Sequence, residues 1–297
     1  MQASQELSLE RGYTIGALAC GTMGTAVLSA ILRGVGEIGE SEGGGEEEGL
    51  VLPGKFYATV HSEKSYDRLG KQFGSKVELL RSNEELVEKS DVILLGCKPF
   101  MAEKILSAIP ESAYTKKKIV VSLLAGKTIS FLKQLTYSKA LVARAMTNTP
   151  SKIGAGMTVV SVDPAEPASS SVQTSVGWIF KQTGRCLFLD EKHQDAATAL
   201  CGSGPAFLYV VTEALIEGGV RMGLPYAIAQ ECAAQVVAGS GQMVLESNEH
   251  PAVLKSQVCT PGGTTIGGLL VMEDNHVRSS ISRAVEEAAN IAASFAK

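Results

Sequence analysis

The sequence predicts an α/β protein in which a doubly wound, mostly parallel sheet is followed by an all-helical domain. Three observations predict it. Short β-like apolar runs alternate with helical segments up to residue 189, and a glycine-rich turn joins the first run to the first helix. From Glu191 onward the chain is Ala-rich, follows helical spacing and shows no β-like run. Alternating strands and helices favour a parallel sheet covered on both faces. We therefore predict two domains, 1–189 and 190–297.

The composition is typical of a globular protein that buries a core. Of the 297 residues, 45% are hydrophobic and 20% are charged, as in ordinary globular domains. The formal net charge is −4, and aromatic residues make up only 5%, which argues against a nucleic-acid partner. No apolar run reaches the length that spans a bilayer and the N-terminus is polar, so we expect neither a membrane span nor a signal peptide.

An acidic, glycine-rich insert occupies residues 36–49. It contains six Glu and no Lys or Arg. A segment of this kind cannot bury enough apolar area to offset the entropy of an ordered chain. We predict a disordered surface loop and assign it no function.

The six cysteines indicate an intracellular protein with reduced thiols. They form no C-x-x-C pair, and no His lies beside them at zinc-ligand spacing. This pattern favours neither a disulfide framework nor a metal site. We expect a cytoplasmic protein without a bound metal.

The first strand leads into a turn of the kind that binds a dinucleotide. A predicted strand at 13–18 is followed by Ala19-Cys20-Gly21-Thr22-Met23-Gly24 and by a predicted helix at 25–32. Strand, glycine turn and helix are the context that a Rossmann fingerprint requires. Alanine occupies the first glycine position, where it must adopt a negative φ or strain the turn. We predict that Ala19, Gly21, Thr22 and Met23 lie against the cofactor's pyrophosphate.

The end of the second predicted strand, 55–60, favours NADP(H). Sites that prefer NAD carry an acidic residue there for the ribose 2′-hydroxyl. This chain has His61-Ser62-Glu63-Lys64 instead. The Ser62 hydroxyl and the Lys64 ammonium suit a 2′-phosphate, whereas Glu63 argues for NAD(H), which stays the alternative cofactor. Equally, Ser62 and Lys64 could simply begin a solvated helix.

The remaining predicted strands place further polar and small residues at the edge where ligands bind in parallel sheets, beyond the carboxyl ends of the strands. Strands are expected at 77–80, 91–96, 119–124, 141–146, 156–160 and 186–189. The ends of three of them carry Lys98-Pro99, Ala125-Gly126 and Asn148, the last interpreted as a structural turn residue.

The C-terminal part is predicted to be entirely helical. Helices are expected at 191–200, 205–222, 225–246, 251–257, 264–273 and 276–296, with Gly202-Ser203-Gly204-Pro205 separating the first two. Ala- and Gly-rich helices pack closely, and such a domain often pairs with a copy of itself. We expect a homodimer or a higher homo-oligomer formed through these helices.

The stretch 259–268, CTPGGTTIGG, is the candidate anion seat. Pro fixes one φ and the paired glycines permit conformations closed to other residues, so successive N–H groups can point into one concavity. A helix starting at Thr264 would add free amides and the positive end of its dipole. The alternative is an ordinary glycine-rich helix start capped by Thr.

Taken together, the motifs resemble those of the pyrroline-5-carboxylate reductases, particularly the fungal ones, over essentially the whole chain. The resemblance rests on ACGTMG at 19–24, DVILLGCKPF at 91–100, RAMTNTP at 144–150, GSGPAF at 202–207, GGVRMGLP at 218–225 and VCTPGGTTIGGLLVME at 258–273. It implies a Rossmann domain, a helical domain interlocked with that of a partner subunit, and an active site near the dimer interface. It also implies reduction of L-1-pyrroline-5-carboxylate to L-proline, the last step of proline biosynthesis, with NAD(P)H.

The same resemblance implies roles for individual residues. The substrate carboxylate would be held by the turn from Thr260 through Gly262, Gly263 and Thr264, and the Thr265 hydroxyl would bind the imine nitrogen. Further residues would contact the cofactor: Asn83 its adenosine half, although that residue could also be a helix cap, and Cys97, Lys98, Pro99, Ala125 and Gly126 its nicotinamide ribose. A cyclic iminium is already electron-poor, so no metal or covalent nucleophile is demanded.

Two alternatives stay open. One is a related imine or β-hydroxyacid reductase; the latter would be expected to carry a catalytic Lys on an early helix of the second domain. Here no Lys follows Lys192 until Lys255, which weighs against it. The other is a non-catalytic nucleotide-binding sensor, indicated only by Ala19. Such a sensor would bind cofactor without turnover.

Overall fold

The computed structural model describes residues 9–40, 51–115, 118–166 and 169–294. The chain divides into two compact units, Met1–Gly202 with Ala289–Lys297, and Ser203–Ala288. The first contains the sheet and the second is helical.

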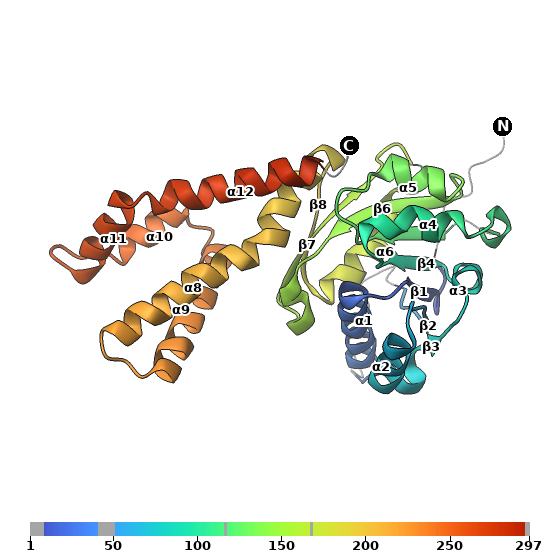
Figure 1. Cartoon of the computed structure of the whole chain (residues 1–297), viewed down its shortest axis with the longest axis horizontal. Coiled ribbons are helices and arrows are strands. Elements are labelled where there is room, and N and C mark those ends of the chain that lie inside the picture. Colours follow the sequence, from blue (N-terminus) through green and yellow to red (C-terminus); the bar gives the residue numbers. More distant parts are fainter. Residues whose placement is uncertain (1–8, 41–50, 116–117, 167–168, 295–297) are drawn as a thin grey trace. The chain divides into compact units, whose positions relative to one another are not determined.

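The first unit is built on an eight-stranded sheet (Figure 1) with the order β3-β2-β1-β4-β5-β6-β7-β8. All its pairings are parallel except that of β6 with β7. The strands are β1 Thr14–Leu18, β2 Lys55–Ala58, β3 Glu78–Leu79, β4 Val92–Leu95, β5 Lys118–Ser122, β6 Ala140–Met146, β7 Gly156–Val162 and β8 Gly184–Phe188. The predicted mostly parallel sheet is confirmed. The chain adds β2 and β3 on one side of β1 and then β4 on the other, so the strand order reverses between β1 and β4, where open α/β sheets bind ligands.

Both faces of this sheet are covered, because neighbouring residues of its strands point to opposite faces. In β4, Val92 and Leu94 belong to one hydrophobic cluster, and Ile93 and Leu95 belong to the other. The first cluster is completed by residues of α1 Thr22–Glu40, α2 Glu63–Phe73 and α6 Ser169–Lys181. The second is completed by residues of α3 Asn83–Lys89, α4 Ala102–Ser107 and α5 Ile129–Leu135. This is the doubly wound arrangement that the sequence predicts.

Helix α1 is longer than the predicted helix at 25–32. It begins at Thr22 and ends at Glu40, so residues 36–40 of the predicted disordered insert are helical. Their Glu residues are compatible with a helix, since Glu is a good helix former and the two glycines here cost only about 1 kcal/mol each. The rest of the insert, 41–49, lies outside the described residues.

The predicted break at Gly202-Ser203-Gly204-Pro205 is wrong. Helix α7 Gln194–Ala197 continues through a π-helical turn, Thr198–Ser203, into α8 Gly204–Arg221. Proline has no N–H for the carbonyl four residues earlier, which is that of Cys201. That carbonyl instead accepts a hydrogen bond of 3.1 Å from Nδ2 of Asn148. The widened turn and this bond let the chain remain helical through Pro205.

Because the break is missing, one helical stretch of the described residues, Glu191–Arg221, is long and apolar enough to cross a membrane by length and composition. Only 6% of its most apolar part is buried within the chain. The expectation that no apolar run reaches this length is therefore wrong, since two shorter apolar segments join.

The second unit consists of helices with a small buried core of its own. Helices α8 and α9 Tyr226–Ser247 pack against each other, and Gly223 between them adopts a φ of 98°. They are followed by α10 Pro251–Gln257, α11 Thr264–Asp274 and α12 Val277–Ser294 (Figure 1). Its buried hydrophobic cluster contains Ile216, Ala229 and Ala233. Many large apolar side chains are exposed, among them Tyr209, Val210, Met222, Val236, Leu270 and Val271.

Candidate active site

The turn after β1 is tied to the end of β2. The Ala19 N–H donates to Oγ1 of the buried Thr59 over 3.0 Å, and the Cys20 N–H donates to the Thr59 carbonyl over 2.7 Å. Ala19 has a φ of 50°, so of the two predicted outcomes it takes the strained one. Left-handed backbone costs an L-residue about 1–2 kcal/mol. The hydrogen bonds to Thr59 hold the turn in this conformation.

The glycines of the turn let the end of β4 pack closely against the first turn of α1. A Cβ on Gly21 would lie 3.0 Å from the Gly96 carbonyl, and a Cβ on Gly96 would lie 3.5 Å from Cα of Gly24. The end of β4 therefore packs directly on the first turn of α1. That helix begins at Thr22, so the first amides, including those of Thr22 and Met23, have no carbonyl partner within the helix. This cradle of amides fits a pyrophosphate.

The predicted 2′-phosphate residues lie at the start of α2. Ser62 is the N-cap of this helix: its hydroxyl accepts from the Ser65 N–H over 3.3 Å and donates to Ser65 Oγ over 3.0 Å. Ser62 and Lys64 are both exposed. Ser62 thus begins a solvated helix, as the alternative interpretation expects. Its exposed hydroxyl can still rotate to donate a hydrogen bond to a phosphate. The 2′-phosphate role of both residues stays a prediction.

Asn83 is the first residue of α3 and not its cap. The cap is Ser82, whose hydroxyl accepts from the Glu85 N–H over 3.2 Å. The interpretation of Asn83 as a helix cap is therefore wrong, and its side chain is available at the helix start. Because β3 pairs in parallel with β2, the residues that follow these two strands emerge at the same edge of the sheet.

Sequence reasoning missed Arg81, which follows β3. Its guanidinium lies 3.7 Å from the centre of the Tyr66 ring and forms an ion pair with both carboxylate oxygens of Glu63. The hydrogen bonds from Arg81 lower the pKa of the Glu63 carboxyl below its usual value. One signal in the sequence could have indicated Arg81. It is a cation that directly follows β3, the strand beside β2.

The predicted nicotinamide-side residues follow two adjacent strands. Strands β4 and β5 pair in parallel, with Leu95 opposite Ser122, so Cys97-Lys98-Pro99 and Ala125-Gly126 come from the same edge. Position 126 requires glycine, because its backbone adopts a φ of 71°. Lys98 is exposed. Burial raises the pKa of the Cys97 thiol to about 11, so this thiol is uncharged at neutral pH and acts as a small apolar group.

The predicted substrate residues lie together on one turn of the helical unit. The Gly263 N–H donates to the Thr260 carbonyl over 3.0 Å, and Gly262 has a φ of 68°. With Pro261 in the second position, this is the pattern of a type II turn. Helix α11 begins directly after it at Thr264. The helix start expected from the sequence is confirmed, and its ligand role stays a prediction.

Thr260 folds back over this turn. A Cβ on Gly263 would lie 2.4 Å from Thr260 Oγ1 and 3.0 Å from the Thr260 carbonyl. Thr260 and Thr264 are exposed and Thr265 is partly buried. The hydroxyl of Thr260 and the free amides at the start of α11 can therefore reach one small anion.

The sequence predicts that Asn148 is a structural turn residue. Its side chain has a structural role, because Oδ1 accepts from the Met157 N–H over 3.1 Å while Nδ2 donates to the Cys201 carbonyl. In the part of the chain that the structure describes, no group of three or more His, Cys, Asp or Glu could hold a metal ion. All six cysteines are free.

Comparisons with known proteins cover both units. A family model described as pyrroline-5-carboxylate reductase dimerisation matches residues 191–295, and one described as NADP oxidoreductase, coenzyme F420-dependent, matches residues 14–126. The pyrroline-5-carboxylate reductase of Schizosaccharomyces pombe is 41% identical over 94% of this chain and 98% of its own. That of Kluyveromyces lactis is 42% identical over 94% and 96%.

Solved structures agree with these sequence relatives. The pyrroline carboxylate reductase of Plasmodium falciparum, crystallised with NADP bound, superimposes with a TM-score of 0.78 at 27% identity, covering 97% of this chain and 99% of that one. The fold is also that of the Coxiella burnetii pyrroline-5-carboxylate reductase, with a TM-score of 0.79 at 24% identity.

Proposed function

Because this chain belongs to the pyrroline-5-carboxylate reductase family, we infer that it reduces L-1-pyrroline-5-carboxylate to L-proline with NADP(H). The observation that carries this conclusion is the identity of 41% to a reductase of that name over nearly the full length of both chains. The structure supports it with two elements that such an enzyme requires. These are a dinucleotide-type turn on the parallel sheet and an anion seat at a helix start.

The residues of the first unit would hold NADP(H), which supplies the hydride when bound. The amides of Thr22 and Met23 would take the pyrophosphate, because Gly21 leaves room for the backbone to approach. Ser62 and Lys64 would bind the 2′-phosphate, and Asn83 the adenosine. The residues after β4 and β5 would frame the nicotinamide ribose.

The turn before α11 would position the substrate. We place its carboxylate on the Thr264 amide and the Thr260 hydroxyl, where an anion is stabilised by a free N–H group and the helix dipole. The Gly263 N–H donates to the Thr260 carbonyl, so Gly263 contributes by holding the turn in shape. The Thr265 hydroxyl would accept a hydrogen bond from the N–H of the iminium ring and orient the C=N bond. Positioning of this kind can contribute up to ~7–11 kcal/mol to catalysis, which is compatible with a site that holds no strong acid.

We further propose that the chain forms a homodimer or a larger homo-oligomer through its C-terminal helices. The dimerisation model matches residues 191–295, and the helical unit exposes large apolar side chains that a single chain does not cover. A second copy, rather than a bilayer, would then cover the apolar stretch Glu191–Arg221. We also propose a domain boundary at residues 189/190. We propose a cytoplasmic location, because free cysteines fit a reducing compartment.

The test of the function is oxidation of NADPH and, in parallel, of NADH by the purified protein with pyrroline-5-carboxylate. We expect turnover with NADPH ahead of NADH. Cofactor binding without turnover would favour the sensor, and turnover only with a different cyclic imine would favour a related imine reductase.

The roles of the two threonines can be tested in the same assay. Thr265→Ala should lower kcat about a hundredfold, because a positioned hydrogen-bond partner of the reacting nitrogen is lost. Thr260→Ala should mainly raise KM, and both variants should bind NADPH with unchanged affinity. Wild-type kinetics in both variants would remove the proposed seat.

A further inference from the structure

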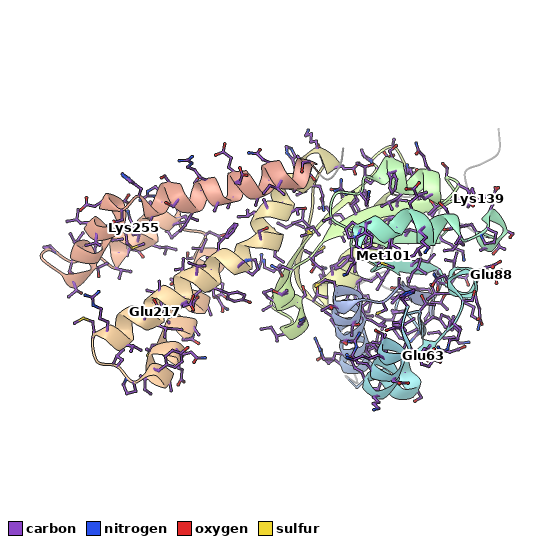
Figure 2. The ribbon with its side chains drawn as sticks, viewed as in Figure 1. Glu63, Glu88, Met101, Lys139, Glu217 and Lys255 are labelled. Carbon is purple, nitrogen blue, oxygen red and sulfur yellow. The ribbon has the colours of Figure 1, made fainter. Side chains whose placement is uncertain are left out.

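Three side chains at the edge formed by the ends of β2 and β3 make a cluster to which the proposed reaction assigns no role. Glu63 is the first residue of α2 and is labelled in Figure 2, Tyr66 is one turn further along that helix, and Arg81 follows β3. Arg81 donates through Nη1 to Oε1 of Glu63 and through Nη2 to Oε2, the second bond measuring 3.0 Å. This is a two-pronged pairing between a planar cation and a carboxylate.

The pairing changes what Glu63 can do. A carboxylate at the end of the second strand ordinarily accepts hydrogen bonds from the ribose 2′-hydroxyl and repels a 2′-phosphate. Here both oxygens of Glu63 already accept from Arg81, so they are engaged and their charge is balanced. With Lys64 beside them, the three charged residues leave a net positive charge, which favours the dianionic phosphate.

Tyr66 fixes the orientation of the guanidinium. The Tyr66 ring packs against one face of Arg81 with a distance of 3.7 Å to the ring centre, and its hydroxyl donates to the Leu79 carbonyl in β3 over 3.3 Å. Arg81 is therefore held between a helix and a strand although 62% of its side chain is exposed. Its exposed face is a flat surface on which a purine base can stack, as bases do on Arg elsewhere.

We propose that Arg81 is the residue that sets the preference for NADP(H) over NAD(H). It does so by neutralising Glu63 and by binding the 2′-phosphate with the N–H groups that Glu63 does not use, while the adenine stacks on its exposed face. This inference rests on the proposed use of NADP(H). It adds a residue and a reason for the preference that Ser62 and Lys64 alone do not supply.

The test is binding, measured without turnover. Titrations of the purified full chain with NADPH, NADH, adenosine 2′,5′-bisphosphate and 5′-AMP give four dissociation constants for each variant. Arg81→Met should weaken NADPH and the bisphosphate about tenfold or more, a loss typical of a charge-assisted contact. The same change should affect NADH and 5′-AMP less than threefold.

Glu63→Gln separates the two parts of the proposal. In the wild-type background it should leave NADPH binding unchanged or tighter. In the Arg81→Met background it should recover part of the lost NADPH affinity, because the carboxylate that repels the phosphate is then gone. Arg81→Lys keeps the charge without the planar guanidinium, so it should retain more of the 2′-phosphate preference than Arg81→Met. The loss of adenine stacking should be the same in both variants, less than about threefold in each of the four ligands.

A matched control is Arg185→Met, on the exposed strand β8 at the opposite edge of the sheet, which should change none of the four constants. The proposal is overturned if Arg81→Met weakens NADPH and NADH equally, if it weakens neither, or if the wild-type protein does not prefer NADPH. A wild-type protein that binds neither dinucleotide contradicts the proposed function itself. Circular dichroism of each variant shows whether it is folded, and Arg81→Lys supplies the measurement if Arg81→Met is not.

Discussion

At the scale of single residues, Ala19 is the clearest point where the local conformation opposes the residue type. It has a φ of 50° in the turn that would hold the pyrophosphate. Glycine pays no penalty for this conformation but loses more chain entropy on folding, by about 0.5–1 kcal/mol. Ala19→Gly should therefore raise the free energy of unfolding by up to about 1 kcal/mol, and the melting temperature by about 2–4 °C.

The control for Ala19→Gly is the same substitution at a residue with ordinary backbone. Ala108 is exposed and has a φ of −81°, so Ala108→Gly should lower stability or leave it unchanged. Thermal unfolding of both variants decides the matter. If Ala19→Gly were the more destabilising of the two, the strain assigned to this turn would be absent.

Cys97 carries a second prediction at this scale, one that depends on pH. Burial penalises its thiolate and raises its pKa to about 11, from an ordinary value of 9.0. At pH 8 the folded protein should thus contain about a hundredfold less Cys97 thiolate than the unfolded chain, and it should react with iodoacetamide correspondingly slowly. The stability that this shift reflects is present below pH 9 and is lost as the pH rises toward 11.

Mass spectrometry of the Cys97 peptide, with protein in denaturant as the reference, measures this alkylation between pH 7 and 10. The expected result is slow labelling in the folded protein and a rate that still rises at pH 10. Labelling at the denatured rate at pH 8 would mean that the thiol is ionised, and Cys97 could then be a redox-active group.

At the scale of elements, the turn before α11 depends on a glycine with no space for a side chain. In Gly263→Ala the new Cβ would meet Thr260 Oγ1 and also the backbone carbonyl of Thr260, which cannot move aside without opening the turn. We expect kcat/KM to fall about tenfold or more, because displacing groups that position a substrate by 1 Å is costly. NADPH binding should be unchanged.

Gly268→Ala is the matched control on the same helix. Apart from its neighbours within the helix, no atom lies within 4 Å of the place where its Cβ would be, and alanine is the better helix former. Steady-state kinetics of both variants should show a loss in Gly263→Ala alone. Equal losses would point to a general sensitivity of α11 and away from the turn as the carboxylate seat.

The elements also show which parts of the fold can be predicted from sequence. Strand positions, the parallel sheet and the helix start at Thr264 follow from local patterns, since alternation, glycine turns and caps act within a few residues. The continuity of α7 into α8 does not, because it depends on the side chain of Asn148, which is 53 residues before Cys201 in the chain.

The same reason explains what was missed in the candidate site. From sequence alone, Glu63 is interpreted as a carboxylate that would bind a ribose hydroxyl. The structure shows that it is paired with Arg81, 18 residues later in the chain. The turn glycines and Thr260 were found because they are adjacent in sequence. Roles that depend on contacts between distant residues need the fold before they can be assigned.

At the scale of the whole molecule, the distribution of apolar surface distinguishes the two units. In the first unit, the large apolar residues of β4 and β5 are buried on both faces of the sheet. In the second, the described residues pack only a small cluster and leave Val236 and Leu270 about 60% exposed. Monomeric proteins rarely expose contiguous apolar patches of more than a few hundred Å², so this unit fits a homo-oligomer whose partner covers these side chains.

The proposed oligomer predicts that a charge on this surface separates the chains. Val236→Asp and Leu270→Asp would each bury an unpaired carboxylate in the interface, at a cost of several kcal/mol. Both should shift the mass measured by light scattering toward that of one chain, 31.2 kDa, and both should lower the melting temperature. Ser75→Asp, an exposed site near the end of α2, adds the same charge outside the helical unit and should change neither quantity. A wild-type protein that runs as a monomer at micromolar concentration would contradict the oligomer directly, and Asp variants that keep the wild-type mass would place its interface elsewhere.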